Sequence, residues 1–107
     1  MAAWNAQELA NGQLPNAKGT LFTATAPTIV REWHVANTSG ATTETVVLYY
    51  KKATSRIVGR VVLAPNESAD IIDESTPLLV LDSGDLLEGS STNATTVDYA
   101  IGGAVFS

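Results

Sequence analysis

From residue 19 onward, hydrophobic and polar positions alternate with a period close to two, in short runs rich in β-branched and aromatic residues. In the run at 45–51, Val46, Leu48 and Tyr50 fall on one face, as expected for a half-buried β-strand. Turn-forming residues separate the runs at intervals of about 8–12 residues, which is typical of an all-β domain. The pattern predicts strands at 19–25, 28–37, 43–52, 57–64, 67–73, 77–82, 85–90 and 95–106.

Some of these strands carry features beyond simple alternation. Ile29, Trp33 and Val35 are expected to share one face of the second strand. Residues 61–63 and 78–81 are apolar at every position, which predicts burial on both faces, one of them in a subunit contact.

The last predicted strand contains Gly102 and Gly103, which indicate a β-bulge or the close approach of another backbone. About eight strands without a helical period predict an antiparallel two-sheet sandwich. The chain has no cysteine, so the Cys…Trp…Cys spacing of an immunoglobulin domain is absent. We therefore expect a jelly-roll-like sandwich.

Residues 1–18 differ from the rest of the chain. Residues 6–10 have the composition of a helical turn, but turn residues at 11–12 interrupt it at once. We interpret the segment as an N-terminal arm, extended around 13–18, that precedes a sandwich domain at 19–107.

Two interpretations of this arm stay open at the level of the sequence. A frayed terminus is the simpler one. Alternatively, the arm orders against a neighbouring subunit, and Trp4 and Leu14 supply apolar anchors that a solvated tail would not need.

Charge is distributed unevenly along the chain. The first sixty residues contain all six basic residues and three acids, whereas residues 61–107 contain eight acids and no lysine or arginine. Such asymmetry indicates an interaction surface, for example a basic flank that meets the acidic flank of another copy. The net charge of −5 argues against general nucleic-acid binding.

Composition narrows the class of protein further. At 107 residues the chain has the length of one domain, and the absence of cysteine excludes disulfides and thiolate metal sites. No apolar run approaches the roughly 18 residues that a membrane span needs, and residues 1–14 lack the pattern of a secretory signal. We therefore expect neither a membrane partner nor secretion by that route.

No motif points to catalysis or to a cofactor. His34 is the only histidine, has no second histidine or cysteine to complete a metal site, and is interpreted as a structural strand residue. There is no nucleophile elbow and no glycine-rich phosphate loop. Exposed aromatic residues that stack on a sugar remain an alternative to aromatic packing. We predict a protein without enzymatic activity, without a metal and without a cofactor.

Two charged clusters are candidates for binding. The compact acidic turn with Asp82 and Asp85 fits a β-turn better than a calcium site, which needs six to eight converging oxygens. The basic cluster fits a soluble strand end and turn better than a phosphate site; its members are Lys51, Lys52, Arg56 and Arg60. We predict that this cluster meets acids at 67–88 in a polar contact between subunits.

The order of several segments resembles a group of small virion proteins of tailed bacteriophages. These segments are Ala10-Asn11-Gly12-Gln13-Leu14-Pro15, Lys18 to Ala24, His34 to Gly40, Thr45 to Tyr50, Pro65-Asn66-Glu67-Ser68, Leu81 to Asp85 and Ile101-Gly102-Gly103. The resemblance covers most of residues 10–106 and rests on the order of turn signals.

The resemblance implies a β-sandwich without catalytic residues that acts as an oligomer, often a trimer. We therefore expect a bacteriophage virion structural protein, in the first place a capsid decoration (cement) protein. It would be made in the host bacterial cytoplasm and bind the major capsid protein, or another virion protein, at the capsid surface. The alternative is a neck- or tail-associated module or a carbohydrate-binding β-sandwich.

Overall fold

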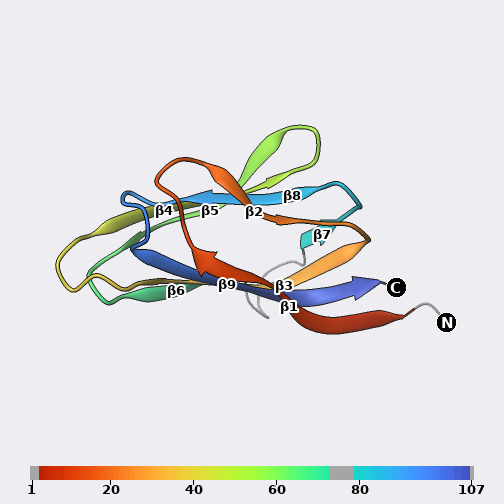
Figure 1. The fold of residues 1–107 in the computed structure, drawn as a ribbon, viewed down its shortest axis with the longest axis horizontal. Coiled ribbons are helices and arrows are strands. Elements are labelled where there is room, and N and C mark those ends of the chain that lie inside the picture. The colour runs from red at the N-terminus through yellow and green to blue at the C-terminus, as the bar shows by residue number, and fades with distance from the viewer. Residues whose placement is uncertain (1–2, 73–78, 107) are drawn as a thin grey trace.

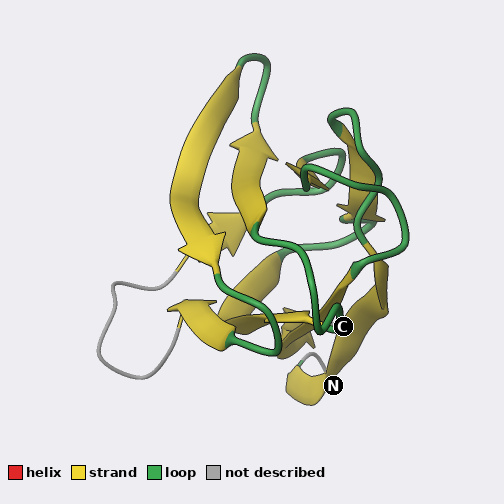
Figure 2. Cartoon of the chain, turned by 90° about the vertical axis from the view of Figure 1, so that its left-hand side faces the viewer, coloured by secondary structure: helices red, strands yellow, loops and turns green. Residues whose placement is uncertain are grey.

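The computed structural model describes residues 3–72 and 79–106. The described residues form β-strands and connecting turns, without a helix (Figures 1 and 2). The strands are β1 Trp4–Gln13, β2 Gly19–Thr23, β3 Thr28–Asn37, β4 Glu44–Lys51, β5 Ser55–Leu63, β6 Ser68–Ile72, β7 Leu79–Leu81, β8 Leu86–Ser90 and β9 Val97–Phe106. The predicted all-β fold is confirmed, and the predicted strand at 28–37 coincides with β3.

The strands make two antiparallel sheets that pack face to face (Figure 1). Sheet A has the order β1-β9-β3-β6, and β7 also pairs with β3. Sheet B has the order β2-β8-β4-β5. β6 pairs with the second half of β3 and β7 with its first half, so the two short strands together form one edge of sheet A.

The pairing is nested along the chain. The first strand pairs with the last, β2 with β8, β3 with β6 and β7, and β4 with β5. A folded-over hairpin of this kind, wrapped into two sheets, is the arrangement of a jelly roll. The predicted two-sheet sandwich is therefore confirmed, with the strand order of a jelly roll.

The core lies between the sheets and is built from the inward positions of the alternating strands. Val46 and Leu48 are fully buried, as the period of two predicted. Trp33 and Val35 are also fully buried, but Val30 takes the place expected for Ile29. A register shift between Val30 and Glu32 is the reason, because a bulge reverses the alternation on its far side.

Gly102 and Gly103 lie opposite this bulge, and the predicted close approach is confirmed. A Cβ atom at Gly103 would stand 2.0 Å from the carbonyl oxygen of Ile29. Any side chain there would force β3 and β9 apart. Two glycines therefore let the two central strands of sheet A pass each other at the bulge.

The predicted N-terminal arm contains a strand of the sandwich. β1 pairs with β9 along its length, from Trp4 opposite Phe106 to Gln13 opposite Asp98. Residues 6–10 are extended and do not form a helical turn. The sequence did not predict this strand, because most of its side chains are exposed and its pairing partner lies at the other end of the chain.

Candidate interaction surfaces

Four exposed carboxylates lie on the outer face of sheet A, and we call this surface the acidic face; they are Glu8, Glu32, Asp70 and Asp98. Glu8 and Glu32 are the cross-strand neighbours of Gly102 on its two sides. Glu32 extends over this glycine, since a Cβ at Gly102 would stand 2.8 Å from the Glu32 carboxylate. Like charges in one rung repel each other, so this surface favours a cationic partner.

The next two rows of cross-strand neighbours on the acidic face each contain a polar pair. His34 and Asp70 are paired at 2.7 Å between Nδ1 and Oδ1, which gives the predicted structural histidine a partner. Gln13 Nε2 donates to Asp98 Oδ1 at 3.3 Å. Between these pairs, β9 presents Ala100. At this position β9 therefore contributes only a short side chain to the acidic face.

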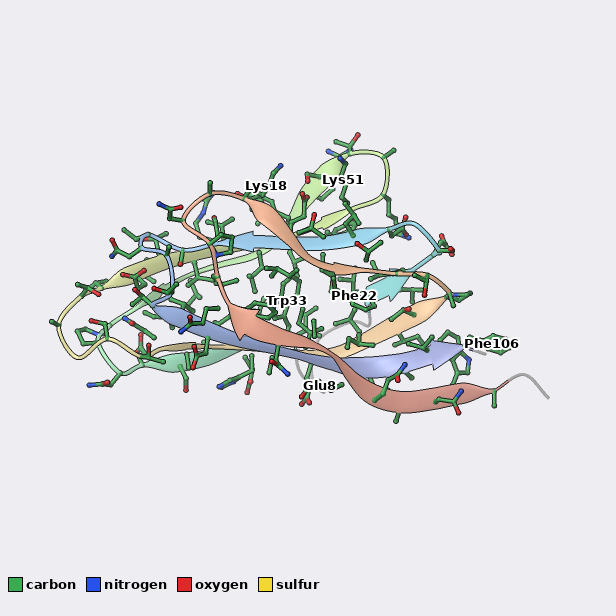
Figure 3. All side chains as sticks on the ribbon, in the orientation of Figure 1. Glu8, Lys18, Phe22, Trp33, Lys51 and Phe106 are labelled. Carbon is green, nitrogen blue, oxygen red and sulfur yellow. The ribbon has the colours of Figure 1, made fainter. Side chains whose placement is uncertain are left out.

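The outer face of sheet B along β4 and β5 has the opposite character. We call it the basic-apolar face, and its residues are Lys18, Val47, Tyr49, Lys51, Ile57, Arg60 and Val62. Ile57 and Val62 are 53% and 59% exposed, although residues 61–63 were expected to be buried on both faces. Figure 3 shows Lys18 and Lys51 above the upper sheet and Glu8 below the lower one.

Two features order the side chains of the basic-apolar face. The ammonium group of Lys18 lies 5.1 Å from the centre of the Tyr49 ring, a cation–π contact. Glu88 is the cross-strand neighbour of Tyr49 in β8, and its carboxylate is buried and accepts a hydrogen bond from the Ser55 hydroxyl. The acid on this face is thus covered, while Lys51 and Arg60 are exposed.

One member of the basic cluster pairs with acids of its own chain, whereas the cluster was predicted to meet acids of another subunit. Lys52 Nζ lies 2.6 Å from Asp85 Oδ2 and 3.4 Å from Asp82 Oδ2, which joins the β4–β5 hairpin to the β7–β8 turn. Asp85 also accepts a hydrogen bond from the backbone N–H of Asp82 at 2.8 Å. The acidic turn is therefore a β-turn that an ammonium group of the same chain neutralises.

These contacts shift the pKa values of both partners. The hydrogen bond from Lys52, followed by the backbone N–H of Asp82, lowers the pKa of Asp85 below its ordinary 3.8. The hydrogen bond to Asp85 raises the pKa of Lys52 above its ordinary 10.5. Both groups are charged over the whole range between these values.

The two apolar anchors predicted for the arm lie in different places. Trp4 is 47% exposed and packs on Phe106, with ring centroids 5.2 Å apart. Leu14 is fully buried in the core of its own chain, where its N–H donates to the Val97 carbonyl at 2.8 Å. Leu14 is therefore a core residue of its own chain and is not exposed as an anchor of the arm.

The sequence analysis missed a buried acid. Glu44 is fully buried, and its carboxylate accepts hydrogen bonds from the Asn93 N–H at 2.8 Å and from the Asn93 side-chain amide at 2.7 Å. The Thr42 hydroxyl donates to it as well, at 3.2 Å. One signal was present in the sequence, because Glu44 precedes Val46 and Leu48 on the core face of β4.

Two further observations concern ligands. β1 and β9 enclose a shallow hollow of about 290 Å³, lined by Asn11, Gly12, Gln13, Asp98 and Tyr99, and burial raises the pKa of Tyr99 above its ordinary 10.0. Among the described residues, no group of three or more His, Cys, Asp and Glu side chains is placed to hold a metal ion. Nor does any described segment form a helix long and apolar enough to span a membrane.

Comparison of the chain with protein-family models, with curated proteins and with solved structures found no match.

Proposed function

We propose that this protein is a structural component of a tailed-bacteriophage virion, in the first place a homotrimeric decoration protein that binds and stabilises the assembled capsid. The observation that carries the proposal is the nested jelly-roll strand order, an architecture that recurs in viral capsid proteins. The sequence resemblance to small virion proteins points in the same direction. This argument is an analogy between proteins that share a fold. One fold can serve many functions, so the experiment below is needed to test the proposal.

The proposed mechanism needs no chemistry at a catalytic centre. A protein that binds only the assembled lattice stabilises that lattice by mass action, in proportion to the logarithm of its free concentration over Kd. Repetition of the site across a capsid adds avidity, so weak individual contacts suffice. The large apolar side chains exposed for such contacts in the described part of the chain are Trp4, Ile57, Val62 and Val80.

The test is to locate the protein on virions of the phage that encodes it, by gold-labelled antibody and electron microscopy. We expect label over the head, and heads stripped of the protein should release DNA at a lower temperature and regain stability when it is added back. Label confined to the neck or tail would favour the neck or tail alternative. Absence of the protein from purified virions would overturn the proposal.

A second candidate function is carbohydrate binding at the hollow of β1 and β9. Its lining combines two side-chain amides, a carboxylate and a phenol ring, a combination suited to sugar hydroxyls and to stacking. A glycan array tests this function, with Tyr99→Ala as the binding-deficient variant and Trp4→Ala, outside the hollow, as the control. No glycan bound by the wild type would exclude it.

A further inference from the structure

We propose that two copies of this chain bind head to tail, with the basic-apolar face of one copy on the acidic face of the next. The inference rests on the proposed homo-oligomer and names the two surfaces that would form it. The faces belong to different sheets of the sandwich and are not equivalent. The contact is therefore heterologous, and it closes into a ring or continues as an open chain.

Charge complementarity within one chain is the first argument. The acidic face presents Glu8, Glu32, Asp70 and Asp98, and the exposed strand positions of the basic-apolar face present Lys51 and Arg60. Among the described residues, neither Lys51 nor Arg60 forms an ion pair, whereas Lys52 does. Sheet A also carries the exposed Arg31 next to Glu32, and Asp70 is paired with His34, but the four carboxylates leave an excess of negative charge on that sheet. Lys51 and Arg60 make the other face positive, which steers unlike faces together and like faces apart.

The shapes of the two faces fit the same arrangement. Ile57 and Val62 protrude on either side of Arg60 along the exposed edge strand β5. On the acidic face, β9 presents the short side chain of Ala100, while the Glu32 side chain covers Gly102. An aliphatic group beside the arginine can pack on Ala100 while the guanidinium reaches the neighbouring carboxylates.

A second copy fits these observations better than other occupants. A nucleic acid would approach the basic-apolar face but be repelled by a chain of net charge −5. A purely apolar partner would leave the acidic face without a role. A second copy uses both faces at once, and each copy added presents the same two faces again.

Two charge-reversal variants test the inference. Variant 1, Lys51→Glu with Arg60→Glu, has two acidic faces. Variant 2, Glu8→Lys with Glu32→Lys and Asp98→Lys, leaves Asp70 as the one carboxylate of the acidic face and so has two basic faces. We expect a wild-type oligomer by light scattering at low ionic strength and a monomer for each variant alone. An equimolar mixture should assemble again, because unlike faces then alternate between the two variants.

The size of the assemblies in the equimolar mixture also shows whether the wild-type oligomer is a closed ring with an odd number of copies. Strict alternation allows only even-numbered closed rings or open chains, so a wild-type trimer should be replaced by assemblies other than a closed trimer. Circular dichroism of each variant checks that it is folded. Arg56→Glu is the matched control for Arg60→Glu. Both arginines lie on β5, but Arg56 is the cross-strand neighbour of Tyr50 and lies on the opposite side of the sheet from Arg60. Only Arg60→Glu should weaken assembly.

Three outcomes would overturn the inference: a wild type that is monomeric at all concentrations, variants that assemble like the wild type, or an equal effect of Arg56→Glu and Arg60→Glu. Failure of the proposed virion function looks different. In that case the purified protein assembles and responds to charge reversal as described, but is not found on virions.

Discussion

Two carboxylates tie distant loops together near opposite ends of strand β8: Asp85, just before this strand, and Glu44, at the start of the neighbouring strand β4. The environments of the two carboxylates are opposite. At the beginning of β8, Asp85 is bound by Lys52 and lies near the surface. Beyond its end, the Asn93 amide groups and the Thr42 hydroxyl bind Glu44, which is fully buried. One carboxylate is paired with a charge in water, the other with neutral donors in the protein interior.

The comparison shows that the stability lost on removing one partner of a polar interaction depends on the surroundings in which the other partner is left. Removal of Lys52 leaves Asp85 to be solvated by water, so the exposed pair contributes little to stability. Removal of the Glu44 side chain leaves a cavity at a fully buried position and takes the acceptor from three partly buried hydrogen bonds. We therefore expect the Glu44 end to be the more sensitive end of the sandwich.

The largest effect is expected for Glu44→Ala, which should lower the free energy of unfolding by about 3 kcal/mol, because it creates a cavity at a fully buried position and removes the acceptor of three hydrogen bonds. Urea unfolding measures the change. Glu44→Gln, which keeps one acceptor oxygen, should cost less. A loss below about 1 kcal/mol for Glu44→Ala would contradict the role assigned to this buried acid.

The next effect concerns Asn37, which is buried at the same end. Its side chain donates to the Thr42 carbonyl at 2.8 Å and accepts from the Ser39 N–H at 3.0 Å. Asn37→Ala should cost about 2 kcal/mol in urea unfolding, because both backbone groups lose a partner. The exposed Thr43→Ala in the same loop should change stability by less than about 0.5 kcal/mol. Equal losses of stability for Asn37→Ala and Thr43→Ala would contradict the role assigned to the Asn37 hydrogen bonds.

A smaller effect is expected in the acidic turn at the other end. Gly84 has a φ of +96°, and a Cβ there would meet no atom within 4 Å. Gly84→Ala should therefore cost about 1 kcal/mol, from backbone strain alone. Gly40→Ala is the control, since its φ is ordinary and its Cβ would make only an ordinary contact at 3.7 Å with the Asn66 side chain. Thermal unfolding of both variants is the measurement.

The smallest effect is expected for Lys52→Met, and it should depend on pH. The folded-state pKa of Asp85 is depressed, so the stability from the pair is present above pH 3.8 and lost as the pH falls through the lower folded value. The pKa of Lys52 is raised, so the same contribution is lost as the pH rises through a value above 10.5.

Urea midpoints of the wild type and Lys52→Met, measured across this range, should differ only between those two limits and less at high salt. A difference that persists at pH 2 would show that the lysine stabilises through packing of its stem and not through its charge.

The sequence predicted the strands of the sandwich well where alternation and turn residues coincide. β3 and β4 are recognisable because their inward positions are apolar and β-branched or aromatic residues dominate. β1 is different, because its side chains are mostly exposed and only its pairing with β9 makes it a strand. Gly102 and Gly103 indicated a bulge or a close backbone approach, but the position of the bulge in β3 was not predictable, since it lies about seventy residues away in the sequence.

The candidate surfaces were predictable only in part. The uneven distribution of charge along the chain is visible in the sequence, and it becomes a difference between two sheets because the bases fall mainly on β4 and β5. Which lysine would be neutralised internally was not predictable. Lys51 and Lys52 are neighbours in sequence, and the position of the hairpin beside the turn decides that Lys52 meets Asp85.

The nested pairing of the strands has a consequence for how the molecule forms during synthesis. Among the strands of residues 3–72 and 79–106, only β4 and β5 are paired neighbours in sequence, and the nested pairs β3–β6, β2–β8 and β1–β9 close successively longer loops around them. Because distant contacts form slowly, this topology favours folding outward from the central hairpin. The N-terminal strand, made first on the ribosome, must wait for the last strand before it has a partner. Until then it remains an unpaired extended segment.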